Sequence, residues 1–320
     1  AAGAEPSSLP IPGMDLPGVK NSTQMLEEEY VPDRLVIIGG GVIGMEFATV
    51  YNDLGCQVTV LEAMDKILPG MDKEISQNLK MIMKKRGVDI HTGAMVSSVE
   101  KMGDGTYLCR YTEKEKKCEA TAAMILSAVG RRPLSRGLFS EDMQERIEME
   151  RGRVLVNERY ETSVPGIYAI GDLIGGVCLA HVATAEGCQA ASAMFPELKG
   201  KDMTVIPSCV YTDPEIACAG LTADEAKAAG IDTATGKYIM SVNGKSVLSM
   251  QDRGFLKIVS EKETGRILGA QLMCARATDM IGELELAISK RLTAEDLAAV
   301  IMPHPTFCEG IGEAAESILM

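Results

Sequence analysis

No run of apolar residues in this sequence approaches the roughly 20 that a helix needs to cross a bilayer, so we expect no membrane span. A secretory signal begins with a basic stretch followed by an apolar one, and this sequence shows no such pattern. Basic residues are also scarce, because 32 Lys and Arg stand against 45 Asp and Glu, a formal net charge of −13. Binding to nucleic acid needs a basic face, so this balance argues against that class of function.

The cysteines lack the spacing of a disulfide scaffold. All nine are scattered, none forms a Cys-x-x-Cys pair, and no two stand five positions apart. We therefore expect a reduced, cytoplasmic protein without a metal site. Cys308 is interpreted either as a packing residue or as a reactive thiol, and both interpretations stay open.

The composition is ordinary for a globular protein, with 46% apolar and 24% charged residues in 320, enough for two or three domains. The opening residues, AAGAEP, contain no helix or strand start. They resemble the end of a strand that enters a connection, and residues 6–20 hold enough Pro and Gly to predict an extended connector. We expect this sequence to be the middle of a longer protein.

The first half alternates apolar runs with amphipathic stretches. The pattern predicts buried strands at 34–38, 57–61, 88–90 and 124–128, helices at 42–54 and 72–86, and a β-meander over 96–119. This order of strand and helix predicts an α/β fold with a parallel sheet.

The pattern changes after about residue 149. We expect short strands at 154–157 and 167–170 and an Ala-rich helix at 180–195. From about residue 204 we expect an α+β part with an antiparallel sheet. Its strands are predicted at 205–211, 237–242, 254–259 and 266–273, and its helices at 222–229, 277–291 and 293–300.

A dinucleotide fingerprint lies between the first strand and the first long helix. Gly39-Gly40-Gly41-Val42-Ile43-Gly44 fits GxGxxG, in which glycines let the backbone approach a pyrophosphate at the helix N-terminus. Glu62 ends the next strand, where a carboxylate accepts hydrogen bonds from a ribose 2′-OH and repels a 2′-phosphate, so the pattern favours NAD over NADP. Met45 and Glu46 follow the motif. Glu46 either balances the helix dipole or contacts the nicotinamide end.

The stretch VIIGGGVIGMEFATVYNDLGCQVTVLE and the segment AVGRRP resemble the NAD domain of dihydrolipoamide dehydrogenases, members of the pyridine nucleotide–disulfide oxidoreductases. This resemblance covers essentially the whole chain. It implies that Gly130 lies beside NAD and that Val96 lies near the adenosine. The segment TSVPGIYAIGD resembles the second flavin motif of the family, which implies that Asp172 binds the ribityl or pyrophosphate part of FAD.

The resemblance implies further residues near FAD. Gly3 belongs to AAGAEP, where the family has ATGSxP, and Ala2 and Ala4 replace two hydroxyl residues. Cys178, Leu179, Ala180 and His181 match the segment under the flavin ring, and we interpret His181 as positioning the backbone rather than as catalytic. Because the first flavin-binding segment of the family, with its own GxGxxG and Cys-x4-Cys disulfide, has no counterpart here, we expect this chain alone to retain little FAD.

The segment PHPTFCE resembles the HPTxxE pattern near the C-terminus of the family. The resemblance implies that His304 exchanges protons with the substrate thiols, that Glu309 orients it, and that His304 acts in the other subunit of a homodimer. An imidazole suits thiol and thiolate chemistry near neutral pH, and a carboxylate partner fixes its tautomer.

The resemblance also implies a division of the chain. Residues 1–29 would be a connector, 30–148 a Rossmann-like NAD-binding domain, 149–203 the remnant of the FAD domain, and 204–320 the dimerisation domain. The implied reaction oxidises dihydrolipoamide to lipoamide with NAD through FAD and a redox disulfide. Implied partners are lipoyl domains of 2-oxo acid dehydrogenase complexes or the glycine-cleavage H protein. Two alternatives stay open: a non-catalytic NAD-binding and dimerisation fragment, or another NAD-linked disulfide or flavin reductase of the family.

Overall fold

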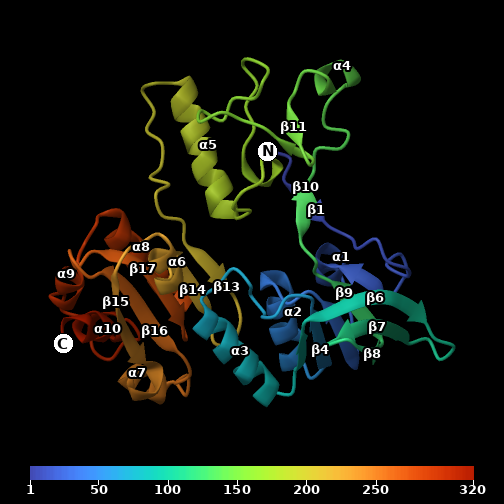
Figure 1. Ribbon diagram of the computed structural model, residues 1–320, viewed down its shortest axis with the longest axis horizontal. Helices are drawn as coiled ribbons and strands as arrows, with labels where there is room; N and C mark the ends of the chain where they lie inside the picture. The colour runs from blue at the N-terminus through green and yellow to red at the C-terminus, as the bar shows by residue number, and fades with distance from the viewer.

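The computed structural model describes residues 1–320 and has three parts (Figure 1). The N-terminal lobe comprises residues 7–130 and lies on the right in this view. The C-terminal lobe comprises residues 204–320 and lies on the left. The bridging segment, residues 131–203, connects the two lobes at the top, and the N-terminus lies against it.

The N-terminal lobe contains a five-stranded parallel sheet with the order β2-β9-β3-β4-β5. Its strands are β2 Val19–Asn21, β9 Met124–Ser127, β3 Arg34–Ile38, β4 Gln57–Glu62 and β5 Asp89–Thr92. The predicted parallel sheet is therefore confirmed. Four consecutive residues of β3 are buried, as expected for a parallel strand that is covered on both faces.

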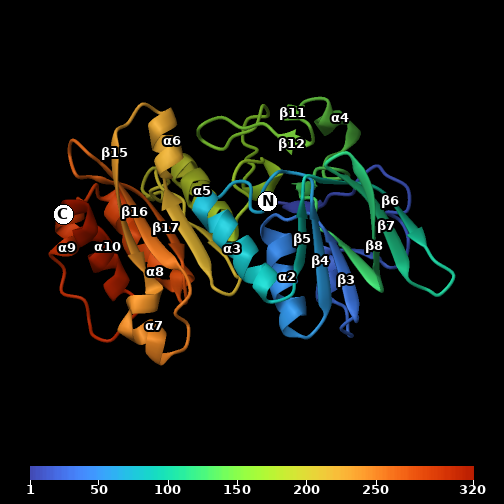
Figure 2. The same ribbon diagram turned by 60° about the horizontal axis from the view of Figure 1, so that its bottom comes forward.

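One face of this sheet packs on α2 (Val42–Asp53) and α3 (Lys73–Lys85), and the other packs on a three-stranded antiparallel sheet. That second sheet consists of β6 Ala94–Lys101, β7 Tyr107–Glu113 and β8 Lys116–Ala122. Figure 2 shows β6, β7 and β8 beside β3, on the side away from α2. Helix α3 begins where the Asp72 side chain accepts a hydrogen bond from the N–H of Glu74, an ordinary N-cap.

The connector is shorter than the expected 6–20, because β2 begins at Val19 and pairs in parallel with β9, and α1 (Ser22–Leu26) follows it. A three-residue strand carries too little apolar pattern to be predicted locally, and its partner lies about a hundred residues further along the chain. Before the connector, β1 (Ala4–Pro6) pairs with β10 (Arg131–Pro133) in the bridging segment.

The two strands expected in the bridging segment do not form as predicted. Only Arg153–Val154 (β12) pairs, with β11 (Met149–Glu150), and Tyr168 makes a single isolated bridge to Glu161. Short apolar runs indicate extended backbone, but a ladder also requires a neighbouring strand in register. The Ala-rich helix forms as α5 (Ala180–Met194), after the 3-10 turn η1 (Gly171–Leu173), and α4 (Glu141–Gln144) is short.

The C-terminal lobe contains the expected antiparallel sheet, with the order β13-β14-β17-β16-β15. Its strands are β13 Ser208–Val210, β14 Ile216–Gly220, β17 Ile267–Met273, β16 Phe255–Glu261 and β15 Thr233–Ile239. Its helices are α6 Ala223–Ala228, η2 Met240–Val242, α7 Gly244–Leu248, α8 Ala277–Ser289, α9 Ala294–Ala298 and α10 Glu309–Leu319. The sequence patterns missed β14, α7 and α10. The strand expected at 237–242 forms at Thr233–Ile239 instead, because the chain turns into the 3-10 helix η2 at Met240.

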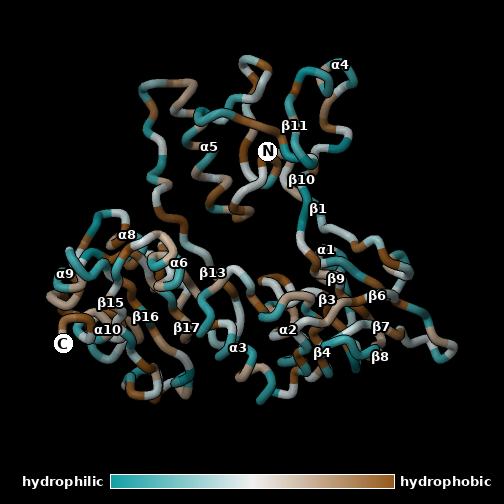
Figure 3. Tube along the Cα trace, viewed as in Figure 1, coloured by the Kyte–Doolittle hydropathy of each residue, from teal (hydrophilic) through white to brown (hydrophobic).

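Apolar residues concentrate on the sheets and thin out over the outer loops, as Figure 3 shows along the backbone trace. No helix combines the length and the apolar character needed to cross a membrane.

Along the C-terminal sheet, Phe255 and Met273 pack into the core of the N-terminal lobe, whereas Leu256 and Leu272 pack under α8 and α10. Successive side chains of a strand point to opposite faces of a sheet. One face of this sheet therefore packs against the N-terminal lobe, and the other packs against the helices of its own lobe.

Candidate dinucleotide and acid–base sites

A cavity of about 520 Å³ lies at the carboxyl ends of β3, β4 and β9. Ligands of parallel α/β sheets bind at this edge. Of the residues predicted to contact NAD, the cavity is lined by Gly39, Gly41, Val42, Ile43, Glu62, Val96 and Gly130. The structure thus brings together residues from the fingerprint, the acidic strand end, the meander and the AVGRRP segment.

The glycines of the fingerprint meet different steric demands. Gly39 has a φ of 109°, and a Cβ there would lie 2.3 Å from the Ala128 carbonyl oxygen. A Cβ at Gly44 would lie 1.9 Å from the Gly39 carbonyl oxygen, so α2 packs against the turn only with glycine at this position. A Cβ at Gly41 would meet nothing within 4 Å. The fingerprint therefore leaves open space at the first residue before α2.

That open space suits a phosphate. Gly41 is the N-cap of α2, and no side chain caps the helix. The first N–H groups of a helix lack intrahelical partners and carry partial positive charge, so an anion is stabilised there. The cavity as a whole is mostly apolar, with Val42, Ile43 and Val96 among its walls. The residues present therefore fit a dinucleotide with a pyrophosphate at α2.

Glu62 holds the turn as well as facing the cavity. One carboxylate oxygen accepts a hydrogen bond from the N–H of Gly40 at 2.6 Å, and the other accepts one from the N–H of Met64 at 2.6 Å. The residue is only 7% exposed. An ionised carboxylate has about four lone-pair sites, so it retains capacity for ligand hydroxyl groups.

Four residues of the predicted set do not line the cavity. Gly40 is buried under the turn. Gly44 and Met45 are buried, and Met45 belongs to the core. The Glu46 side chain accepts a hydrogen bond at 2.9 Å from the N–H of Tyr211 in the C-terminal lobe. Burial raises the pKa of Glu46 above its ordinary value, and the hydrogen bond from Tyr211 partly opposes this. Glu46 therefore links the two lobes, a contact that the sequence did not indicate.

The residues predicted near FAD lie around the bridging segment. Gly3 has a φ of 78°, and its carbonyl oxygen accepts a hydrogen bond from the N–H of Leu134 at 2.9 Å. Asp172 lies in η1, and Cys178, Leu179 and Ala180 lead into α5. The turn at Asp172 is held by Glu186, whose buried carboxylate accepts a 2.6 Å hydrogen bond from the N–H of Gly171.

Sequence reasoning missed Glu186, although a signal existed. It is the one acidic residue within α5, a helix otherwise rich in Ala. A carboxylate on the buried side of such a helix needs a partner, and the orphan N–H of Gly171 supplies one. Glu186 therefore positions the turn that carries Asp172.

The His181 side chain hydrogen-bonds to backbone. Its Nε2 atom lies 2.9 Å from the carbonyl oxygen of Pro207, so this nitrogen is the donor. The contact joins the first turn of α5 to the segment that enters the C-terminal lobe. His181 also lines a cavity of about 270 Å³ between α5 and residues 201–207.

His304 and Glu309 form a hydrogen-bonded pair. The Nδ1 atom of His304 lies 2.7 Å from one carboxylate oxygen of Glu309, and the other oxygen accepts a 2.8 Å hydrogen bond from the N–H of Thr306. The Thr306 N–H and then His304 hold the pKa of Glu309 below its ordinary value. Since an ionised carboxylate only accepts, Nδ1 carries the proton and Nε2 is left as an acceptor.

This pair lies at the start of α10 in the C-terminal lobe, and neither residue lines the dinucleotide cavity. In both ribbon views α10 lies on the side of the molecule opposite β3 and β4 (Figures 1 and 2). The His304 side chain is 77% exposed. Val300 and Ile301, just before it, are also exposed, and Ile301 is exposed to 95%. The structure therefore does not bring His304 to the cavity of its own chain, and it leaves Val300 and Ile301, shortly before His304 in the sequence, uncovered.

Comparisons with family models cover most of the chain. The model described as pyridine nucleotide-disulphide oxidoreductase matches residues 1–187, and the model of the dimerisation domain of the same group matches residues 206–315.

Curated relatives are similar over almost the whole chain. A dihydrolipoyl dehydrogenase of Bacillus subtilis is 43% identical over 93% of this chain and 63% of its own length. The Geobacillus stearothermophilus enzyme of the same name is 39% identical over 96% of this chain and 66% of its own length. That of Thermus scotoductus is 39% identical over 99% and 69%. The chain thus spans less than two thirds of the first two relatives.

Solved structures share the fold. The HOCl-induced flavoprotein disulfide reductase RclA from Escherichia coli superposes with a TM-score of 0.91 at 28% identity, over 99% of this chain and 72% of the other. LpdA from Mycobacterium tuberculosis superposes with a TM-score of 0.88 at 29% identity, over 100% of this chain and 68% of the other.

Proposed function

The chain belongs to the pyridine nucleotide-disulphide oxidoreductase family, and on this premise we propose that it acts in an NAD-dependent dihydrolipoyl dehydrogenase. The observation that carries the proposal is the presence, in one chain, of a fingerprint cavity closed by Glu62 and of the paired His304 and Glu309. The names of the three curated relatives support the same reaction.

In the proposed reaction the substrate dithiol closes to a disulfide, losing two protons and two electrons, and NAD⁺ takes up a hydride while a proton is released. When bound, FAD and NAD supply the electron and hydride transfer. The residues of this chain bind and orient. The α2 N-terminus behind Gly41 holds the pyrophosphate, and Glu62 accepts hydrogen bonds from the adenosine ribose.

His304 handles the proton. Because Glu309 accepts from Nδ1, the Nε2 atom takes a proton from a substrate thiol, and the resulting imidazolium is stabilised by the same carboxylate. The exposure of His304, with apolar neighbours, suits an action in the site of a second subunit. We therefore propose a homodimer formed through residues 204–320, which the match to a dimerisation domain supports.

On the FAD side we propose Gly3, Asp172, Cys178, Leu179, Ala180 and His181. Support comes from the turn at Asp172, which Glu186 fixes, and from the contact of His181 with Pro207. As partners we propose lipoyl domains of 2-oxo acid dehydrogenase complexes or the glycine-cleavage H protein, because these carry the dithiol substrate. The proposed setting is cytoplasmic.

Because no two cysteines of this chain have the Cys-x4-Cys spacing, the 320-residue chain alone should turn over no dihydrolipoamide. The test is therefore an assay of this chain joined to a flavin-binding and redox-disulfide segment of its family, supplied with dihydrolipoamide and either NAD⁺ or NADP⁺. The expected result is formation of NADH and little NADPH. One observation favours a second candidate, the likeness to the RclA reductase at a TM-score of 0.91. If NADH is oxidised by other disulfides or oxidants while dihydrolipoamide is never turned over, the second candidate replaces the first.

A further inference from the structure

Lys257 is a charged residue in the middle of the C-terminal sheet. It lies on β16, on the same face as Phe255, which packs into the core of the N-terminal lobe. The residue is only 9% exposed. A lysine is almost never buried without a partner, so its contacts across the interface indicate what it does.

The ammonium group of Lys257 reaches the start of α3. Its Nζ atom lies 3.0 Å from each carboxylate oxygen of Asp72 and 2.9 Å from Glu74. Burial alone would lower the pKa of Lys257, but hydrogen bonds with Glu74 and Asp72 raise it above its ordinary value. Asp72 is the N-cap of α3, so the C-terminal lobe holds this helix at its first turn.

Asp72 directly follows the loop 63–71, which supplies Ala63 and Pro69 to the wall of the dinucleotide cavity. Ser76 connects Asp72 to this loop, because its hydroxyl lies within hydrogen-bond distance of the carbonyl oxygens of Asp72, at 3.4 Å, and of Leu68, at 3.3 Å. The N–H of Leu68 in turn donates to the carbonyl oxygen of Gly40 at 2.8 Å. A continuous set of contacts thus runs from Lys257 to the fingerprint turn.

The same loop contains a conformation that its surroundings must enforce. Leu68 has a φ of 47°, in the left-handed region that non-glycine residues rarely adopt. Its side chain is fully buried, so the loop cannot relax by turning it into solvent. Such a residue persists where several contacts over-determine it, and such sites often belong to a binding surface.

We propose that Lys257 is a positioning residue for the dinucleotide cavity: by holding Asp72, it keeps the loop 63–71 against Gly40 and makes NADH affinity depend on the C-terminal lobe. The inference rests on the proposed function only in taking the cavity as the NADH site. In this proposal the C-terminal lobe is coupled to the nucleotide cavity of the N-terminal lobe through packed contacts rather than through a hinge.

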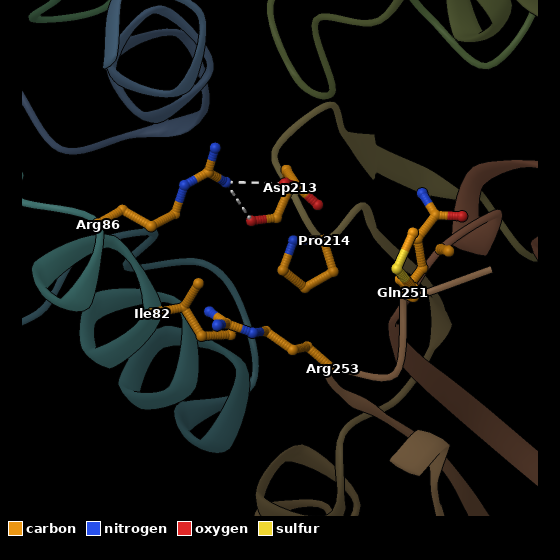
Figure 4. A pocket seen from close by; sticks show the side chains of 8 residues that line it. Ile82, Arg86, Asp213, Pro214, Gln251 and Arg253 are labelled. Carbon is orange, nitrogen blue, oxygen red and sulfur yellow. Dashed lines mark hydrogen bonds and ion pairs between the residues drawn. The ribbon is translucent and has the colours of Figure 1, made fainter. Parts of the chain in front are cut away.

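Two other ion pairs cross the interface and provide matched controls. Lys237 on the neighbouring strand β15 pairs with Glu74 but does not contact Asp72. At the opposite end of α3, Arg86 pairs with Asp213 at 2.8 Å. Figure 4 shows Arg86 directed at Asp213, and both residues line a cavity of about 320 Å³ that Arg253 also lines. Neither pair touches the loop 63–71.

The experiment compares Lys257→Met with Lys237→Met and Arg86→Gln in the 320-residue protein. NADH dissociation constants, melting temperatures and amide hydrogen exchange of residues 63–71 are measured for each. We expect Lys257→Met to weaken NADH binding on the order of tenfold, within the usual range of coupling between sites, and to speed exchange in the loop. The two controls should leave both unchanged even where the melting temperature falls.

Asp72→Asn is the second variant, because asparagine caps a helix as well as aspartate does but carries no charge for Lys257. Asp72→Asn should also weaken NADH binding. Lys257→Arg keeps the positive charge, so it should bind NADH more tightly than Lys257→Met does. The proposal is overturned if Lys257→Met and Asp72→Asn bind NADH like the unmodified protein, or if the controls weaken binding equally. Failure of the unmodified protein to bind NADH would instead overturn the dinucleotide assignment, and the proposal with it.

Discussion

The carboxylate of Glu62 accepts a 2.6 Å hydrogen bond from the N–H of Gly40, although 22 residues separate the two in the sequence. The residue that we propose to select the nucleotide therefore also closes the turn that holds its pyrophosphate. Charge and hydrogen bonding at Glu62 have separate consequences, because the charge repels a 2′-phosphate whereas the turn needs acceptors for the N–H groups of Gly40 and Met64.

The first prediction separates these two roles. The unmodified protein should bind NADH at least about tenfold more tightly than NADPH, a difference of about 1.4 kcal/mol. Glu62→Gln should narrow that gap by improving NADPH binding, because it removes the negative charge. Its single amide oxygen can accept from only one of the N–H groups of Gly40 and Met64, so NADH binding should weaken, but less than in Glu62→Ser. Glu62→Ser should narrow the gap and also weaken NADH binding, since the N–H groups of Gly40 and Met64 lose their partner. Calorimetric titration of the three proteins with each nucleotide measures all six affinities. Equal affinity of the unmodified protein for both nucleotides would contradict the argument.

The second prediction concerns the proton-transfer pair. In the chain joined to a flavin-binding and redox-disulfide segment, His304→Gln should reduce dihydrolipoamide oxidation by about 100- to 10,000-fold, the usual contribution of a general acid–base group. Glu309→Gln should reduce it less, because the imidazole stays in place without its carboxylate. NADH binding should be unchanged in both variants, since neither residue lines the dinucleotide cavity. A His304→Gln variant with near-normal turnover would remove His304 from the mechanism.

The third prediction concerns the surface beside His304. Ile301 is 95% exposed, an unusual position for a large apolar side chain three residues before the proposed acid–base group. Ile301→Glu should shift a dimer toward monomer in light scattering and should lower dihydrolipoamide turnover while NADH binding persists. Leu26→Glu is the control, because Leu26 is 79% exposed in the N-terminal lobe. An unmodified protein that is monomeric at micromolar concentration would count against the proposed homodimer.

The fourth prediction is a pH dependence of stability. His91 lies between two carboxylates, with Nδ1 2.8 Å from Glu113 and Nε2 2.9 Å from Asp89. Burial lowers the pKa of His91, but the two hydrogen-bonded carboxylates outweigh it and raise the pKa above its ordinary value of 6.5. A raised folded-state pKa stabilises the protein fully below the unfolded pKa, and this contribution is lost as pH rises through the folded one.

His91→Gln should therefore lower the melting temperature by a few degrees in mildly acidic buffer and by much less in alkaline buffer. Thermal unfolding followed across the neutral range measures both proteins under the same salt. A melting-temperature difference that stays constant with pH would show that the charge of His91 does not contribute.

Patterns along the chain predicted the features that depend on local geometry. GxGxxG requires a turn in which Gly39 and Gly44 approach backbone too closely for any side chain, so the residue types themselves indicate the structure. The same holds for His304 and Glu309, which are five positions apart and meet at the start of one helix. A strand buried on both faces consists of a continuous apolar run, and that run in residues 34–38 predicted β3 as a buried parallel strand.

Tertiary structure alone decided which distant residues meet. The sequence predicted a helix-dipole or nicotinamide role for Glu46 but gave no sign that it accepts a hydrogen bond from the N–H of Tyr211. It likewise gave no partner for Glu186, which accepts from the N–H of Gly171. Lys257 and Asp72 are 185 positions apart. A buried charged group needs a hydrogen-bond partner, and this much follows from the residue type. Which residue becomes the partner depends on how the lobes and helices pack, and no local period in the sequence encodes that packing.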